Sequence, residues 1–130
     1  MKMKQKTMLA VAVSFVAAGS FAASFSASAQ SEPPSYTASP KIYKLVSEND
    51  QFRVIHQTIK PGQRDAWHSH AGNLVAYRLT DCNSRTHTPD GKHTDANRKR
   101  GEVAFLPAVP SHSFENRGKT TCETLIVERK

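Results

Sequence analysis

Two sparse patterns of glycine, histidine, proline and asparagine constrain this 130-residue chain more than any other feature. They read Gly62-x5-His68-Ser69-His70 and Gly101-x5-Pro107-x4-His112-x3-Asn116. Successive side chains of an extended strand point to opposite faces, so His68 and His70 share one face. A β-fold that sets the segment around His112 beside them would assemble three imidazoles into one facial site suited to a metal ion.

Short strand-like stretches separated by turn signals fill the chain from residue 42 onwards. The expected strands cover residues 42–46, 52–59, 66–70, 74–79, 103–106, 113–115 and 124–127. Turns are indicated at Lys60-Pro61-Gly62, Pro89-Asp90-Gly91 and Asn116-Arg117-Gly118. Helical periodicity is missing from the sequence, which therefore predicts an all-β domain, either a sandwich or a barrel.

The first 29 residues have the pattern of a secretory signal peptide. Lys2, Lys4 and Lys6 precede an apolar run over residues 8–18, and small residues then lead to a cleavage point before Gln30. This run is too short to span a bilayer. We therefore expect a periplasmic or secreted protein that has no stable membrane association after cleavage.

Removal of this leader changes how the rest of the chain is read. Residues 30–40 are rich in serine and proline and predict a disordered or extended arm, while residues 41–130 are enough for one domain. The chain has 18 basic and 11 acidic residues, and the leader takes three lysines, which leaves a net charge of +4. Only Arg98-Lys99-Arg100 is a basic cluster, which we interpret as a solvated turn. With no aromatic series beside it, a nucleic-acid partner is not expected.

The two histidine-containing patterns resemble the paired motifs of the cupins, over about residues 52–128. Cupins are small β-barrels of jelly-roll type, so the resemblance implies a cupin-type jelly-roll barrel over residues 41–130. It also implies that His68, His70 and His112 are metal ligands, and that the protein acts on or binds a small molecule. Cupins often pair through their sheets, so a homodimer is a further expectation.

Three positions depart from the cupin pattern. Cupins usually place a metal-binding glutamate four residues after the second histidine, where this chain has Leu74. Asp81 and Val109 stand where motif glycines are expected.

These departures leave two functional interpretations open. Three neutral imidazoles hold a divalent zinc, iron, copper, nickel or manganese ion without a carboxylate, and cupins with three histidines include oxygen-using enzymes. The chain is then an exported, metal-dependent enzyme of oxygenase type. The alternative is a non-catalytic barrel that carries a metal or a small ligand, or is purely structural. No Ser-His-Asp or paired-carboxylate constellation is present in the sequence, so no catalytic residue is assigned.

The jelly-roll topology implied by the resemblance also concerns the two cysteines. It pairs the strand after the double-histidine segment with the last strand, which brings Cys82 near Cys122. In an oxidising compartment we expect a disulfide between them rather than two buried thiols. Closing a loop of about 41 residues would stabilise the fold by roughly 4 kcal/mol on the chain-entropy model.

The remaining histidines are weaker candidates for function. His87 and His93 lie symmetrically about the Pro89-Asp90-Gly91 turn, so a hairpin makes them cross-strand neighbours. We expect them to be exposed hairpin residues rather than a surface metal site. His56 has no identifiable partner in the sequence and is interpreted as structural.

Four other residues are candidates for roles around the site. Arg78 shares a strand face with Leu74 and would meet an anionic substrate if it pointed inward, but we expect it to point outward. Phe114 shares a face with His112 and would wall the cavity or belong to the core. Asn73 is a candidate oxygen ligand, and Asn116 is expected to tie the turn that follows it.

Overall fold

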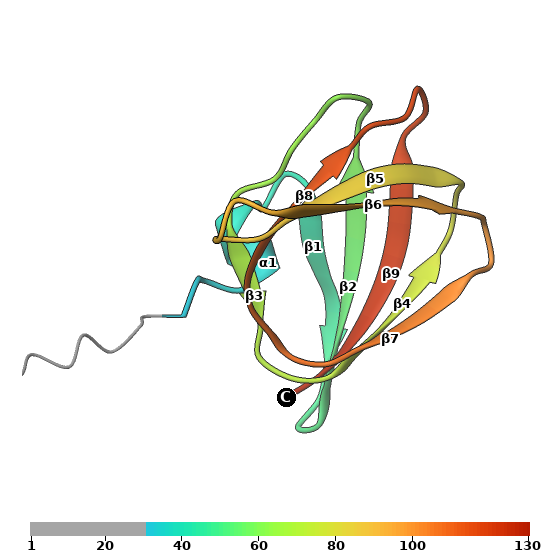
Figure 1. Ribbon diagram of the computed structural model, residues 1–130. Coiled ribbons are helices and arrows are strands. Elements are labelled where there is room, and N and C mark those ends of the chain that lie inside the picture. The colour runs from blue at the N-terminus through green and yellow to red at the C-terminus, as the bar shows by residue number, and fades with distance from the viewer. Residues whose placement is uncertain (1–30) are drawn as a thin grey trace, which may run out of the picture.

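The structure is a computed structural model that describes residues 31–130, and these residues form two antiparallel sheets that face each other (Figure 1). The strand order is β1-β2-β9-β4-β7 in the five-stranded sheet and β3-β8-β5-β6 in the four-stranded sheet. The elements are α1 (Ser35–Ala38), β1 (Tyr43–Glu48), β2 (Phe52–Ile59), β3 (His68–His70), β4 (Leu74–Arg78), β5 (Cys82–His87), β6 (His93–Arg98), β7 (Val103–Leu106), β8 (Val109–Asn116) and β9 (Cys122–Arg129). The all-β jelly-roll prediction is confirmed.

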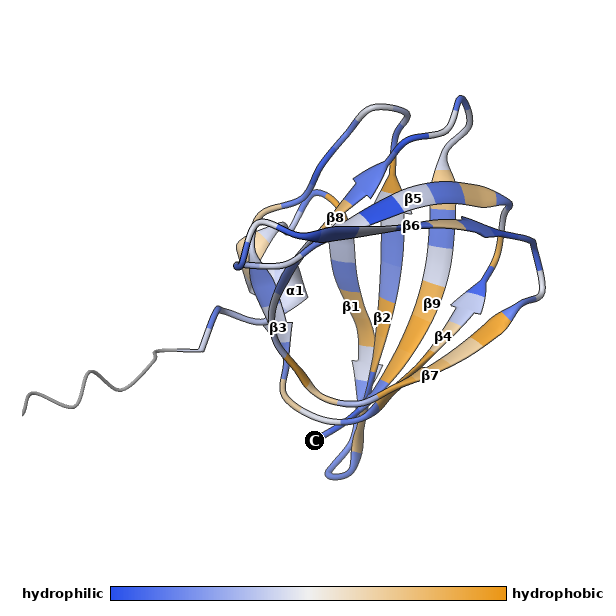
Figure 2. Cartoon of the chain, viewed as in Figure 1, coloured by the Kyte–Doolittle hydropathy of each residue, from blue (hydrophilic) through white to orange (hydrophobic). Residues whose placement is uncertain are grey.

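The core lies between the two sheets because the long strands alternate buried and more exposed residues along their length. In β2 the inward side chains include Ile55 and Ile59, and in β9 they include Cys122 and Ile126. Figure 2 shows hydrophobic colour on β2, β9 and β4, and also on β7, whose large apolar residues are exposed. The buried apolar residues are Ile42, Tyr43, Ile55, Ile59, Leu74, Ala76, Cys82, Phe114, Cys122 and Ile126.

The hairpin of β5 and β6 was only partly foreseen. The turn at Pro89-Asp90-Gly91 and the pairing of His87 with His93 are confirmed. The two strands were absent from the expected set because their residues are mostly polar and show no apolar alternation, as their hydrophilic colour in Figure 2 illustrates. They form strands through pairing with each other and with β8.

The segment at the start of the described chain corrects one prediction. Residues 30–40 were expected to be a disordered or extended arm, but residues 31–40 pack against β3 and include α1. The backbone N–H of Ser69 donates to the carbonyl of Pro33 at 3.0 Å, and Pro34 forms a parallel bridge with Ser69. Because β3 is an edge strand with unpaired backbone groups, it offers this serine- and proline-rich segment hydrogen bonds that composition does not reveal.

The predicted signal peptide, residues 1–29, lies outside the described residues. Within residues 31–130, no helix has the length and apolar character needed to cross a membrane.

Several motif residues stabilise turns and do not belong to the candidate site. Gly62 and Gly101 have φ angles of 74° and 86°, a left-handed conformation that favours glycine. Asn116 is fully buried, and its side-chain amide donates to the carbonyls of Ile59 and Thr120 at 2.9 and 2.8 Å. Its Oδ1 accepts from the backbone N–H of Gly118 at 2.9 Å. The predicted role of Asn116 in tying its turn is confirmed.

The predicted disulfide is also confirmed. β4 pairs antiparallel with β9, and Cys82 and Cys122 are bonded with their Cα atoms 5.1 Å apart. The bond links the end of one sheet to the other, because β5 and β9 belong to different sheets.

Candidate metal centre

The three predicted histidines converge on the inner side of the four-stranded sheet. β3 pairs with β8 so that His68 lies directly opposite His112, and His70 follows on the same face of β3. One ring nitrogen from each histidine can be chosen so that all three nitrogens lie within 4.8 Å of one another. The ring centroids of His68 and His112 are 4.2 Å apart, and each lies 5.2 Å from that of His70.

Hydrogen bonds at Nδ1 fix the orientation of two of these rings. His68 Nδ1 lies 2.9 Å from the carbonyl oxygen of Ala66, and His70 Nδ1 lies 3.0 Å from Oε2 of Glu128. Both partners are acceptors, so each Nδ1 carries the proton and each Nε2 keeps a lone pair. His68 Nε2 is buried and has no hydrogen-bond partner. A buried nitrogen lone pair without a partner, facing two further imidazoles, fits a metal ligand.

Burial keeps the imidazoles of His68 and His112 in the neutral form that binds metals. Burial, with the nearby imidazoles of His68 and His70, lowers the pKa of His112 to about 3. Burial also lowers the pKa of His68, although the neighbouring carboxylate of Asp65 opposes the shift.

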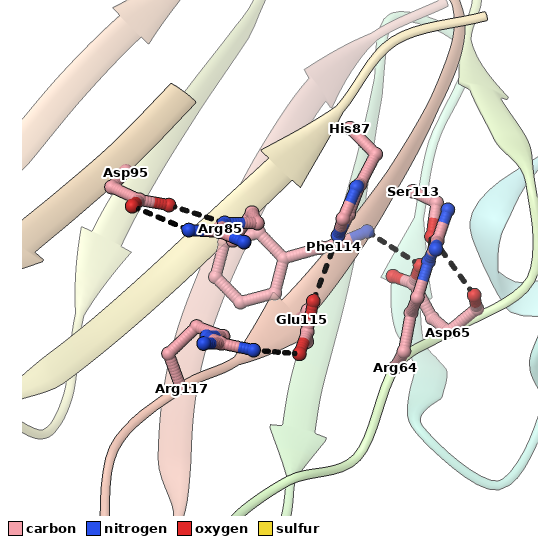
Figure 3. Close-up of polar contacts among 9 residues, drawn as sticks. All are labelled: Arg64, Asp65, Arg85, His87, Asp95, Ser113, Phe114, Glu115 and Arg117. Carbon is pink, nitrogen blue, oxygen red and sulfur yellow. Dashed lines mark hydrogen bonds and ion pairs between the residues drawn. The ribbon is translucent and has the colours of Figure 1, made fainter. Parts of the chain in front are cut away.

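A buried network of hydrogen bonds around Asp65 holds the loop that leads into His68. Asp65 Oδ2 accepts from the Tyr43 hydroxyl at 2.6 Å. Its Oδ1 accepts from the backbone N–H of Phe114 at 2.6 Å (Figure 3). The Ser113 hydroxyl donates to the carbonyl oxygen of Asp65 at 3.0 Å. Burial raises the pKa of Asp65 despite these donors. The network ties the loop before β3 to β1 and β8, and so holds His68 opposite His112.

A cavity of about 240 Å³ opens beside the histidines, between the two sheets. His70 and His112 line it from one side, and Arg78 lines it from the opposite sheet. Its other walls are the amide of Gln57 and the apolar and hydroxyl-bearing residues Tyr43, Leu74, Ala76, Thr86, Thr88, Leu106, Val109, Phe114, Thr124 and Ile126. The volume is below the 300–1,000 Å³ typical of drug-sized ligands, so the cavity suits a small molecule.

Comparison with solved structures identifies the architecture. A cupin domain from Bordetella pertussis Tohama I is 22% identical, with a TM-score of 0.63 over 78% of this chain and 98% of that chain. A protein with a double-stranded β-helix domain from Klebsiella pneumoniae is 22% identical, with a TM-score of 0.56 over 68% of this chain and 75% of that chain. The chain has the cupin fold.

A third structure of this fold is a polyketide cyclase from Streptomyces resistomycificus, 21% identical, with a TM-score of 0.53 over 67% of this chain and 63% of that chain. No protein-family model matches the sequence. No curated protein matches it.

The sequence did not point to Glu128, which is the carboxylate beside the three histidines. Glu128 is 1% exposed, and besides His70 it accepts from the backbone N–H of Ala71 at 3.1 Å. Burial opposes its ionisation, but the hydrogen bond from His70, with that from Ala71 and the charge of Arg53, outweighs burial and lowers the pKa of Glu128. Glu128 lies two residues after the inward Ile126, and this alternation along β9 is the one sign in the sequence that its side chain points inward. In the cupin fold seen here, Glu128 is the Cα partner of Leu74, the residue at the usual glutamate position.

The expected outward orientation of Arg78 is wrong. Arg78 follows the inward phase of Leu74 and Ala76 and lines the cavity, where its Nη1 donates to Oγ1 of Thr124 at 2.6 Å. The hydroxyl of Thr124, inward on the adjacent strand, gives the guanidinium a partner that the sequence of β4 alone does not show. Phe114 lines the same cavity and belongs to the core.

Asn73 does not join the histidines. Its side chain lines a separate groove with Phe52 and Phe105, and its backbone carbonyl accepts from the N–H of Arg129 at 2.9 Å. It is not part of the cluster of potential ligands formed by the three histidines.

The other histidines lie away from this centre. The rings of His87 and His93 are 6.1 Å apart, and His87 Nε2 lies 2.8 Å from Oε2 of Glu115 (Figure 3). Glu115 is thus a neighbour that the sequence reading of this pair overlooked. His56 Nε2 lies 3.4 Å from Oε1 of Glu123, a partner likewise not identified from the sequence.

Proposed function

We propose that this cupin-fold protein binds one divalent transition-metal ion through His68, His70 and His112. The observation that carries the proposal is the buried, unpartnered Nε2 of His68 within a cluster of three imidazole nitrogens that lie within 4.8 Å. The metal is one of zinc, iron, copper, nickel or manganese, and imidazole ligands favour the first four of these. When bound, such an ion supplies Lewis acidity and open coordination positions for water, oxygen or a substrate.

The metal content of protein purified without an affinity tag tests this proposal. We expect about one equivalent by mass spectrometry in the wild type, or after reconstitution, and under about a tenth of an equivalent in His112→Ala. His93→Ala is the matched control, because His93 is on the exposed hairpin and should leave metal content unchanged. Less than a tenth of an equivalent in reconstituted wild type would contradict the proposal.

We further propose that the protein is a metal-dependent enzyme, of oxygenase type, that acts on a small molecule. The cavity of about 240 Å³ bordered by His70 and His112 supports a substrate site beside the ion. The polyketide cyclase among the structural neighbours is an example of an enzyme with this fold. Oxygen uptake by iron-loaded protein with small thiols, phenols and diketones is the assay. Turnover that His112→Ala abolishes is expected, and uptake unaffected by that change would refute catalysis at this centre.

A non-catalytic binding barrel is the second candidate. Among the described residues that line the cavity there is no carboxylate, so proton transfer would fall to histidines or to Tyr43, whose pKa burial and the charge of Asp65 raise well above its usual value. A binder would show a higher melting temperature with metal or ligand, through mass action, while no substrate is consumed.

We propose that the protein is exported to the periplasm or secreted. The disulfide between Cys82 and Cys122 supports an oxidising compartment. Mass spectrometry of the native protein from fractionated cells tests this, because export by the predicted signal peptide leaves Gln30 as the first residue. A cytoplasmic fraction with an intact leader would contradict the proposal.

We also propose that two copies pair through the outer face of the five-stranded sheet. Val54, Val127, Val75 and Phe105 form one row in register across β2, β9, β4 and β7. Phe105 is 80% exposed, and a groove of about 450 Å³ lies beside it. A two-fold pairing buries the same apolar row from both copies. Light scattering should give a dimer mass for the wild type and a monomer mass for Phe105→Glu; a monomeric wild type refutes the pairing.

A further inference from the structure

A polar row crosses the floor of the cavity opposite the histidines. Gln57 on β2 is the Cα partner of Thr124 on β9, and Thr124 is the Cα partner of Arg78 on β4. All three side chains line the cavity, whereas the rows of the sheet beside them are apolar, as at Ile126 and Ala76. Buried polar groups require hydrogen-bond partners. The donors and acceptors of these three side chains that lack a partner in the protein therefore indicate which ligand the cavity binds.

Arg78 has most of its hydrogen-bonding capacity unused. One guanidinium nitrogen donates to Thr124, and the Cζ atom lies 5.5 Å from the centroid of the Phe114 ring. Within residues 31–130 no ion pair joins Arg78 to a carboxylate, and the acid that acts on its charge, Glu102, lies 3.6 Å from Arg98 instead. A guanidinium carries five N–H donors in a planar fork that matches a carboxylate. Arg78 is therefore a half-buried cation without an anion.

Gln57, which lines the same cavity, has a side-chain oxygen that is buried and has no hydrogen-bond partner. Its Nε2 donates to the hydroxyl oxygen of Tyr43 at 2.9 Å, and that hydroxyl donates its own proton to Asp65. This chain of bonds fixes which end of the amide is which, because the Tyr43 oxygen has no proton left to give to Gln57. Oε1 of Gln57 is consequently the end of the amide that points away from the Tyr43 hydroxyl, and it is buried without a hydrogen-bond partner.

We propose that the cavity binds a small monocarboxylate that also carries a hydroxyl, amino or thiol donor. The carboxylate pairs with the guanidinium of Arg78, and the donor satisfies Oε1 of Gln57. Arg78 is the single arginine or lysine among the lining residues, which matches one negative charge. The volume of about 240 Å³ limits the molecule to about ten heavy atoms, since a cavity of about 150 Å³ holds benzene. The monocarboxylate would be the substrate or ligand of the proposed metal-dependent protein, so its biological role rests on that proposed function. Its binding to Arg78 does not require the metal ion.

Binding of three matched probes to metal-free mature protein, followed by nuclear magnetic resonance shift titration, tests the inference. Lactate has both the carboxylate and a hydroxyl, lactamide lacks the charge, and propionate lacks the hydroxyl. We expect lactate to bind most tightly. Arg78→Met should weaken lactate binding at least about 10-fold, as expected for a lost charged hydrogen-bonding partner, and should leave lactamide nearly unchanged. Arg85→Met is the control, because Arg85 is paired with Asp95 on the β5–β6 hairpin.

The outcomes separate this inference from the metal proposal. Equal lactate binding by wild type and Arg78→Met, or equal binding of lactate and lactamide by wild type, overturns the carboxylate site whatever the metal content. Propionate binding as tight as lactate binding overturns the role of Gln57. Arg78-dependent lactate binding in a protein that takes up no metal sustains the inference while the metal proposal fails. If Arg78→Met does not fold, Arg78→Lys keeps the charge but loses the planar fork, and it should still bind lactate more weakly than wild type.

Discussion

Replacing Glu128 with glutamine tests whether the carboxylate sets the proton position of His70, because glutamine changes the hydrogen bonding while it keeps the packing. The two carboxylate oxygens of Glu128 accept from His70 Nδ1 at 3.0 Å and from the backbone N–H of Ala71 at 3.1 Å. Arg53 Nη1 lies 3.9 Å from the second oxygen. Glutamine keeps the length and shape of the side chain but has one acceptor oxygen, so it cannot accept at both places.

The size of the effect follows from the two contacts. If the amide oxygen stays on Ala71, its NH2 group faces His70 Nδ1, which must then become an acceptor and move its proton to Nε2. Nε2 is the nitrogen that would bind the metal, so we expect affinity to fall about 10- to 100-fold, the usual effect of losing such a supporting hydrogen bond. In metal-free protein, loss of a hydrogen bond from a buried charged acceptor should lower the free energy of unfolding by roughly 1.5–3 kcal/mol.

Competition with a calibrated chelator measures the affinity, and urea unfolding in the presence of chelator measures the metal-free stability. Glu123→Gln is the matched control, because Glu123 lies on the same strand but is half-exposed and beside His56. Its metal affinity should equal that of the wild type. A Glu128→Gln protein that is destabilised yet binds metal as tightly as the wild type would refute the reasoning that Glu128 sets the tautomer of His70.

Three further changes test the scaffold. Serine at both Cys82 and Cys122 should lower the free energy of unfolding by about 4 kcal/mol in urea titrations, and an unchanged midpoint would contradict a structural disulfide. Asn116→Ala removes three side-chain hydrogen bonds and should cost about 3 kcal/mol by the same assay, whereas the exposed Asn97→Ala should cost almost nothing. Gly72→Ala would place a Cβ 1.9 Å from the carbonyl oxygen of Arg129, so its melting temperature should fall sharply; a wild-type value would show that β9 yields there.

The sequence was most informative where a local rule decides the structure. The placement of His68 and His70 on one face follows from the two-residue period of a strand. Both reach the cluster, although β3 is only three residues long and its register against β8 shifts between them. The register that sets His112 opposite His68 depends on the long-range pairing of β3 with β8, which no local pattern contains. The resemblance to the cupins supplied that part of the expectation.

Residues whose role depends on a partner strand were beyond local reasoning. Glu128 is 58 positions from His70 in the sequence and meets it only through the folding of β9 against β4. Arg78 was correctly placed on the face of Leu74, and this face points inward, but its partner Thr124 comes from β9 and is not visible in the sequence of β4. The polar strand β5 likewise forms because β6 and β8 flank it, and not because its own residues alternate.

The relation between Leu74 and Glu128 explains how the centre keeps a carboxylate without the expected ligand. The usual cupin pattern has a glutamate at position 74, where Leu74 is 4% exposed and packs in the core. Its Cα partner on the adjacent strand is Glu128, whose carboxylate lies beside His70 Nδ1. The carboxylate is therefore not at the usual ligand position but lies on the neighbouring strand β9, where it hydrogen-bonds to the ligand His70. A carboxylate in that position increases the basicity of the imidazole but contributes no anionic ligand. An ion held by the three imidazoles would therefore keep more of its positive charge than one with a glutamate ligand, and this favours an anionic molecule at the cavity beside it.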